Sequence, residues 1–156
     1  IHLIGHLYLF LDYLARSTAN MAFSNSGSSL RDFYIHEALI FIEHNFQNDI
    51  SVEDIADVCG LNRTYFGKIF KKAIGKSPQE FLLNYRMLKA AELLKLTRLS
   101  ISDISNAVGY ANPLHFSRAF KSIYGIPPRE WRNQNQMLIS EQSDYGYPPK
   151  TTQQDE

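Results

Sequence analysis

A short segment in the middle of the chain combines two phenylalanines with a series of basic residues at helical spacing. Phe66 and Phe70 are four residues apart, so they share one face of a helix and can anchor it in a core. The residues left for the outer face are Arg63, Thr64, Gly67, Lys68, Lys71 and Lys72. Arg and Lys donate hydrogen bonds to phosphates or to guanine, and Thr can contact a base edge or a methyl group. This face therefore suits a polyanion, and its glycine either permits a close approach to the backbone or is a neutral surface substitution.

A second segment, further along the chain, repeats this arrangement with a less charged outer face. Phe116 and Phe120 are its anchors. The residues on its outer face are Leu114, His115, Ser117, Arg118 and Lys121. Arg118 has the same place relative to the second phenylalanine as Lys68, which makes it the first candidate for a base contact. The leucine can touch a thymine methyl group, whereas the histidine can pack, contact a phosphate or read a base.

Both segments belong to a duplicated unit of two helices. Residues 51–60 match residues 100–109 at an offset of 49, and the offset becomes 50 from Phe66 onward because the second turn holds one extra residue. Each copy begins with a serine that can cap a helix, and each turn contains a glycine. Two helices around such a turn form a helix-turn-helix motif, in which the second helix enters the DNA major groove. We place the motifs at about 51–74 and 100–124.

One long helix, predicted for residues 77–97, separates the two copies. It begins with a Ser-x-x-Glu capping box and has proline at its first position. Its predicted inward face consists of Phe81, Tyr85, Leu88, Ala91 and Leu94. A length of roughly 30 Å is close to the ~34 Å of one DNA turn, so the helix can hold two reading helices in successive major grooves. Arg86 either touches phosphate between the grooves or, as we favour, forms an internal ion pair with an acid such as Asp54 or Asp57.

The region before the repeat has two parts. Residues 1–16 are predicted to form a separate amphipathic helix that belongs to a preceding domain or to a dimer contact. Residues 17–31 are rich in Ser and Asn and are predicted to be a linker. His2 and His6 have the spacing of metal ligands, but no third ligand is near, so surface or interface positions are favoured. Because residue 1 is not methionine, the chain is expected to be a fragment of a longer protein.

The predicted domain covers residues 32–134. A helix over residues 32–46 precedes the first motif, and a short helix ending near Asn133 follows the second. Residues 135–156, rich in Gln, Ser, Asp and Pro, are predicted to be a disordered tail. The predicted fold class is therefore all-α, with two helix-turn-helix subdomains joined by a long central helix, plus the separate N-terminal helix.

Composition limits the possible functions. The single cysteine, Cys59, excludes a disulfide framework or a cysteine-based zinc site within one chain and favours a cytoplasmic setting. No apolar run is long enough to span a membrane. The 16 basic and 16 acidic residues cancel, yet nine basic residues and two acidic residues lie between Arg63 and Arg98. That basic stretch is either a set of solvated helix faces or a polyanion site. Seven acidic residues and no basic residue lie between Asp32 and Asp57.

These motifs resemble the DNA-binding domain of the AraC/XylS family over about residues 33–133. The resemblance rests on the matching stretches Ser77-Pro-x-x-Phe81, Arg86…Ala90…Leu94 and Val108-Gly-Tyr…Phe116-Ser-Arg-Ala-Phe120-Lys…Gly125…Pro128…Trp131. It implies a bacterial transcription regulator, usually an activator, with seven helices. The positions that correspond to the family's base-reading residues are Thr64, Gly67 and Lys68 in the first motif, and Leu114, Ser117 and Arg118 in the second. Glycine at the middle position of the first motif departs from the longer polar residue often found there.

The resemblance also implies partners. They are double-stranded DNA, RNA polymerase, and a second copy bound through a missing N-terminal domain that dimerises and binds a small-molecule effector. Residues 1–16 resemble the last helix of such a domain. The effector is often a sugar in such architectures, which suggests control of carbohydrate-metabolism genes. No cofactor, metal or membrane contact is expected.

Three function classes remain to be weighed. Sequence-specific DNA binding follows from the doubled motif and its basic faces. A helical protein-interaction module that binds the transcription machinery is the alternative, because the acidic stretch could serve as its contact surface. An enzyme is not expected, because the chain has no catalytic triad, paired carboxylates or phosphate-binding glycine loop, and a DNA-repair methyltransferase would need several zinc-binding cysteines.

Overall fold

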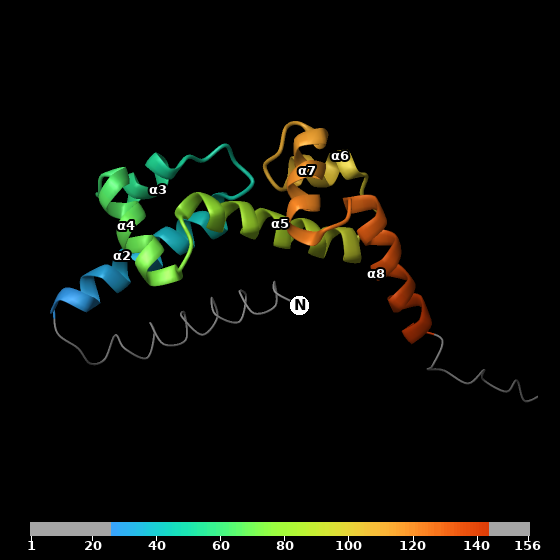
Figure 1. Ribbon diagram of the computed structural model, residues 1–156, viewed down its shortest axis with the longest axis horizontal. Helices are drawn as coiled ribbons and strands as arrows, with labels where there is room; N and C mark the ends of the chain where they lie inside the picture. The colour runs from blue at the N-terminus through green and yellow to red at the C-terminus, as the bar shows by residue number, and fades with distance from the viewer. Residues whose placement is uncertain (1–25, 144–156) are drawn as a thin grey trace, which may run out of the picture.

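Residues 26–143 are described by the computed structural model, and within them every regular element is an α-helix (Figure 1). The helices are α2 (Ser26–Asn45), α3 (Val52–Val58), α4 (Arg63–Ile74), α5 (Pro78–Leu96), α6 (Ile101–Ala107), α7 (Pro113–Tyr124) and α8 (Pro128–Ser143). These seven helices confirm the predicted all-α class and the predicted order of two short-helix pairs around one long helix. The expected helix at residues 1–16 lies outside the described residues.

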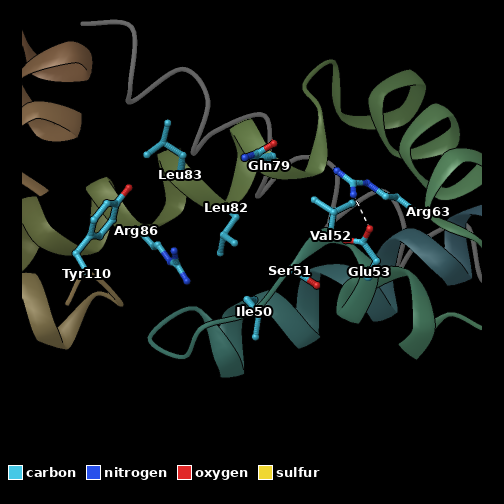
Figure 2. Close-up of a pocket in the computed structure, with 10 residues that line it drawn as sticks. All are labelled: Ile50, Ser51, Val52, Glu53, Arg63, Gln79, Leu82, Leu83, Arg86 and Tyr110. Atoms are coloured by element: carbon cyan, nitrogen blue, oxygen red, sulfur yellow. Dashed lines mark hydrogen bonds and ion pairs between the residues drawn. The ribbon is translucent and has the colours of Figure 1, made fainter. Parts of the chain in front are cut away.

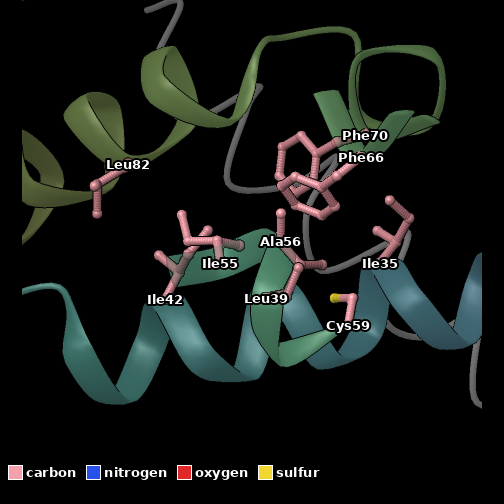
Figure 3. Packing of buried hydrophobic residues seen from close by; sticks show 10 residues of the cluster. Ile35, Leu39, Ile42, Ile55, Ala56, Cys59, Phe66, Phe70 and Leu82 are labelled. Carbon is pink, nitrogen blue, oxygen red and sulfur yellow. The ribbon is translucent and has the colours of Figure 1, made fainter. Parts of the chain in front are cut away.

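The two helix pairs lie at opposite ends of α5, each with a core of its own (Figure 1). The first core joins α2, α3 and α4 to the beginning of α5. Its buried residues are Ala38 and the nine that Figure 3 labels: Ile35, Leu39, Ile42, Ile55, Ala56, Cys59, Phe66, Phe70 and Leu82. The second core joins α6 and α7 to the rest of α5, and its buried residues are Met87, Ala90, Ala91, Leu94, Ile104, Val108, Phe116 and Phe120. We call the two halves the first and second subdomains.

Serine capping boxes begin three of the helices. Ser51, Ser77 and Ser100 each accept a hydrogen bond from the backbone amide three residues later. In each case the acidic side chain at that third position accepts a hydrogen bond from the amide of the serine. Two otherwise unpaired amide groups are thus satisfied at each helix end, which makes the start of each helix a locally determined feature.

The buried face of α5 differs from the predicted one. Ala91 and Leu94 are buried as predicted, but Phe81, Tyr85 and Leu88 are only partly buried. The other buried residues of α5 are Pro78, Leu82, Met87 and Ala90. A single inward face that packs against both subdomains was expected. The helix instead packs its first half on one subdomain and its second half on the other, so two differently oriented faces are covered.

Two predicted boundaries were also wrong. Helix α2 begins at Ser26, so residues 26–31 belong to a helix and not to the linker. Helix α8 continues to Ser143, so the predicted disordered tail is helical over residues 135–143. Within this extension, the Gln136 amide lies 3.4 Å from the carbonyl oxygens of both Leu94 and Thr97 and caps the end of α5.

The lone cysteine is a core residue. Cys59 is 8% exposed, and its thiol donates a hydrogen bond to the Tyr34 carbonyl oxygen at 3.3 Å. Burial, assisted by the nearby carboxylate of Glu37, raises the pKa of the Cys59 thiol. The thiol therefore remains protonated and acts as a small apolar side chain. Among residues 26–143, no helix is both long enough and apolar enough to cross a membrane.

Candidate nucleic-acid interface

The first helix-turn-helix motif consists of α3, a glycine turn and α4. Gly60 has a φ of 66°, a left-handed conformation that glycine adopts without steric cost. The amide of Leu61 closes the turn by donating to the Ala56 carbonyl oxygen at 3.0 Å. Asn62 then caps α4, whose buried rings of Phe66 and Phe70 have centroids 5.4 Å apart. The two rings fix which face of α4 points away from the core.

That outward face of α4 carries the predicted site residues of the first motif. Arg63, Thr64, Lys68, Lys71 and Lys72 are exposed, and Gly67 is half-buried. Most of them line a shallow groove of about 400 Å³ that continues along the beginning of α5. A Cβ atom at Gly67 would meet no other group within 4 Å, so packing does not require glycine at that position. The backbone of α4 is accordingly accessible at the middle of the basic face.

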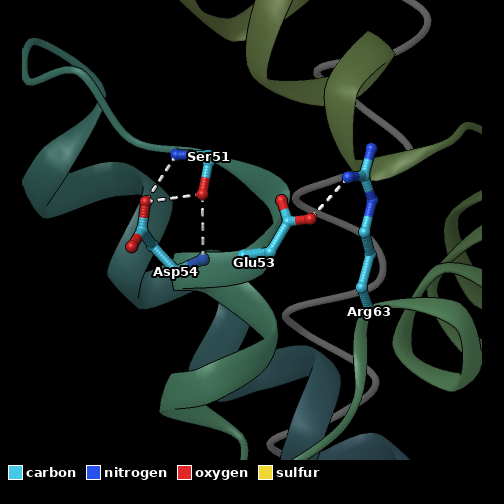
Figure 4. Close-up of polar contacts among 4 residues, drawn as sticks. All are labelled: Ser51, Glu53, Asp54 and Arg63. Atoms are coloured by element: carbon cyan, nitrogen blue, oxygen red, sulfur yellow. Dashed lines mark hydrogen bonds and ion pairs between the residues drawn. The ribbon is translucent and has the colours of Figure 1, made fainter.

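One residue of this face already has an acidic partner. The Arg63 guanidinium donates to the Glu53 carboxylate of α3 at 2.5 Å, as Figure 4 shows. Both side chains are more than half exposed, so this ion pair contributes little to stability. It does determine where Arg63 points. The sequence pattern did not predict Glu53 as the partner of Arg63. A usable signal was present, because Glu53 lies on the helix that precedes α4 and Arg63 is the first residue of α4.

The second motif has the same plan with α6, Gly109 and α7. Gly109 has a φ of 83°, and the Asn112 side chain accepts hydrogen bonds from the amides of Leu114 and His115. Ser105 replaces the buried alanine of the first motif. Its hydroxyl donates to the Tyr110 carbonyl oxygen at 2.7 Å, so this carbonyl group of the longer turn has a hydrogen-bond partner.

The outward face of α7 carries the predicted site residues of the second motif. Leu114, His115, Arg118 and Lys121 are exposed, and Ser117 is half-buried. Leu114 is 56% exposed, so its side chain is available for an apolar contact with a ligand. Each motif thus gathers its own predicted residues on one helix face, and α5 keeps the two faces on separate subdomains. The 19 residues of α5 span about 28 Å.

Arg86 lies between the subdomains and pairs with neither of the predicted acids. Its Nε donates to the Phe46 carbonyl oxygen and its Nη2 to the Asn48 carbonyl oxygen, each at 2.7 Å. The preferred expectation of an ion pair with Asp54 or Asp57 was therefore wrong. Burial lowers the pKa of Arg86, and the neighbouring Tyr110 and Asp49 act in the opposite direction.

A family profile described as a helix-turn-helix domain matches residues 55–134, just over half of the chain. The Msm operon regulatory protein of Streptococcus mutans is 34% identical over 134 residues, which cover 86% of this chain and 48% of that protein. The lactose operon transcription activator of Staphylococcus xylosus is 43% identical over 99 residues, which cover 64% of this chain and 36% of that protein. The chain thus spans about half or less of the length of these curated relatives.

Solved structures show the same architecture. An AraC-type DNA-binding transcriptional regulator from Chromobacterium violaceum superposes with a TM-score of 0.62 at 33% identity, covering 71% of this chain and 96% of that one. These similarities agree with the two helix-turn-helix motifs and define a class of DNA-binding transcriptional regulators. The chain belongs to the AraC family of transcriptional regulators and contains the DNA-binding domain of that family.

Proposed function

We propose that this chain is the DNA-reading part of a transcription activator that recognises a bipartite operator with α4 and α7 in successive major grooves. In this proposal regulation proceeds by binding and not by catalysis. The residues that contact DNA are those predicted from the sequence on the outward faces of the two helices. Arg118 and Leu114 read bases, while Arg63, Lys71, Lys72 and Lys121 contact phosphates.

One observation carries the proposal. Each second helix buries its two phenylalanines completely and turns its basic residues outward. Six cations lie on the two outward faces: Arg63, Lys68, Lys71, Lys72, Arg118 and Lys121. Cations near phosphates release condensed counterions, so a DNA complex of this kind must weaken steeply with salt. A protein-interaction module would need no such concentration of positive charge.

Selection of bound DNA from a random library by the purified chain tests this proposal. We expect two half-sites whose centres lie about 10–10.5 base pairs apart, because α5 holds the reading helices about one turn apart. The logarithm of the binding constant should fall with the logarithm of salt concentration, by about 0.9 for each phosphate contacted. Enrichment of no sequence, or affinity independent of salt, would rule out this function.

The proposal also concerns which genes are regulated and which effector is bound. The similarity to a lactose operon transcription activator supports a role in carbohydrate metabolism. We propose that the longer protein binds a sugar and dimerises through the region that precedes this domain. A reporter gene placed behind the selected site should respond to one class of sugar when the longer protein is expressed. A response to no sugar would rule out this part alone.

Activation also needs a contact with RNA polymerase, and we propose that the acidic surface of the first subdomain provides it. Glu43, Asp49 and Asp57 are exposed and lie outside the predicted DNA-reading faces. Charge reversal at Glu43 and Asp57 should reduce activation of a reporter and leave DNA affinity unchanged. Unchanged activation would remove this surface from the proposal without affecting DNA recognition.

A further inference from the structure

Arg86 makes contacts on both sides of the boundary between the subdomains. On the first side its guanidinium donates two hydrogen bonds of 2.7 Å to the backbone carbonyl oxygens of Phe46 and Asn48, between α2 and α3. On the second side its Cζ atom lies 5.8 Å from the ring centroid of Tyr110, which follows the glycine turn of the second motif. A single side chain of α5 therefore touches a loop of each subdomain.

The glycine turn of the second motif reaches the same carbonyl group. A Cβ atom at Gly109 would lie 2.8 Å from the Phe46 oxygen and 3.1 Å from both Cζ and Nη2 of Arg86. The equivalent glycine of the first motif, Gly60, also has a positive φ, but a Cβ atom there would meet nothing within 4 Å. The conformation is shared by the two turns, whereas the close approach belongs only to Gly109.

Phe46 completes this contact region. Its side chain packs against the buried residues of both cores. Its ring also meets Tyr85 of α5 edge-on, with centroids 5.3 Å apart. A cavity of about 330 Å³ borders the region, and Figure 2 shows Arg86 and Tyr110 at one end of its lining and Arg63 with Glu53 at the other. The direct contact is thus limited to a few residues beside α5.

We propose that Arg86 is a positioning residue for DNA recognition, and that Phe46, Arg86, Gly109 and Tyr110 form a junction that sets the spacing of the two recognition helices. This inference rests on the proposed recognition of a bipartite DNA site. A single helix such as α5 can bend and can allow a subdomain to twist about its end. Contacts made away from the helix axis restrain that twist, so the junction converts two tethered motifs into one unit of fixed geometry.

The expected consequence is a preference for one half-site spacing. Two additional base pairs turn the second half-site by about 70° around the duplex, because one turn contains about 10–10.5 base pairs. With an intact junction, this insertion should weaken binding about 10- to 100-fold, since contacts of one motif are lost. Without the junction, the second subdomain can follow the rotated half-site.

Arg86→Ala tests the junction on the DNA selected by the unaltered chain. We expect the spacing penalty to shrink to about threefold or less, while the affinity for each isolated half-site stays unchanged. Lys95→Ala is the matched control, because it removes an exposed cation from the same helix at a distance from the junction. Arg86→Lys should restore part of the penalty. A folded Arg86→Ala protein that keeps the full penalty would overturn the inference.

A measurement without DNA separates this inference from the proposed function. Spin labels at Ala73→Cys and Ser122→Cys, both exposed positions on the second helices, report the distance between the motifs in a Cys59→Ala background. The distance distribution should be narrow and should broaden when Arg86→Ala is added. An unchanged width would overturn the junction, whether or not the chain binds DNA. Failure of the chain to select any DNA sequence would instead overturn the proposed function.

Gly109→Ala and Gly60→Ala provide a second matched pair. Both substitutions place a side chain in the left-handed region, so both should lower stability. Gly109→Ala should lower it further, because its Cβ atom would also lie 2.8 Å from the Phe46 carbonyl oxygen. Only Gly109→Ala forces a Cβ atom against the Phe46 carbonyl group. It alone should relax the spacing preference and broaden the distance distribution. Equal behaviour of the two variants would contradict a specific junction at Gly109.

Discussion

The two helix-turn-helix motifs share their internal framework and differ on their outer faces. Both have a serine capping box, a glycine turn, an asparagine cap and two fully buried phenylalanines. On α4 the outer face carries four cations: Arg63, Lys68, Lys71 and Lys72. On α7 it carries two, Arg118 and Lys121, beside the exposed Leu114. The residues that hold each motif together are thus similar in the two copies, whereas the outward-facing residues differ.

This difference predicts a division of roles in DNA binding between the two motifs. A dense set of lysines supplies attraction to phosphates that does not depend on sequence. One arginine and one exposed apolar side chain are better suited to a guanine edge and a thymine methyl group. We therefore expect the first motif to contribute mainly affinity and the second mainly specificity.

The strongest test of this division compares equivalent residues, Arg118→Ala and Lys68→Ala. Arg118→Ala should cost about 1–3 kcal/mol on the selected site and relax specificity at one base pair, because a bidentate base contact is lost. Lys68→Ala should weaken binding by similar factors on all sequences and reduce the salt dependence by about one phosphate. Titration of both variants against matched and mismatched duplexes provides the measurement. Equal specificity profiles would contradict the division.

A second test concerns the interiors of the motifs. Ser105→Ala removes the hydroxyl that donates to the Tyr110 carbonyl oxygen and leaves that oxygen without its side-chain partner. We expect a loss of about 1 kcal/mol in the free energy of unfolding, measured by chemical denaturation. The equivalent residue of the first motif is Ala56, where the shorter turn needs no such donor. No loss for Ser105→Ala would show that water replaces the hydroxyl.

A third test concerns the Arg63–Glu53 ion pair, which only the first motif has. Ser102 and Pro113 occupy the equivalent positions of the second motif and cannot form it. Glu53→Gln should increase DNA affinity a few-fold, because Arg63 no longer divides its hydrogen bonds between carboxylate and phosphate. Stability should change by less than about 1 kcal/mol, since the pair is exposed. Unaltered affinity in a salt titration would show that Arg63 does not contact DNA.

The smallest expected effect is a change in folding stability as the pH is lowered. Hydrogen bonds from the Ser51 hydroxyl and amide lower the pKa of Asp54 below its usual 3.8. A lowered folded-state pKa stabilises the fold above the unfolded value, and this contribution is lost as pH falls from about 4 through the folded pKa. Wild type and Asp54→Asn should therefore differ in stability at pH 7 and converge in strong acid. A constant difference across that range would mean that the carboxylate charge has no role in the cap.

Local features of the fold followed directly from the sequence. Each N-cap, glycine turn and phenylalanine pair depends on residues within a few positions of one another, so its physical cause lies in a short stretch. The outward placement of Thr64, Lys68 and Arg118 follows from the same helical spacing. The faces of the two recognition helices could be predicted for that reason.

Features that depend on distant parts of the chain could not be predicted in this way. Arg86 finds its acceptor 40 residues earlier, at Phe46, and no spacing rule favours a carbonyl group over an acid. Gln136 caps α5 at Leu94, 42 residues earlier, and no local pattern around Gln136 predicts that contact. The buried face of α5 could not be predicted from periodicity either, because the two halves of the helix pack against different cores.

By itself, then, the sequence determined two capped motifs, their glycine turns and the residues on their outer faces, because hydrogen bonds and side-chain periodicity within a helix act over a few residues. Only the tertiary structure decided how the motifs are joined. The backbone carbonyl of Phe46, which meets both Arg86 and the turn at Gly109, has no signature in the sequence, since every residue carries the same carbonyl group.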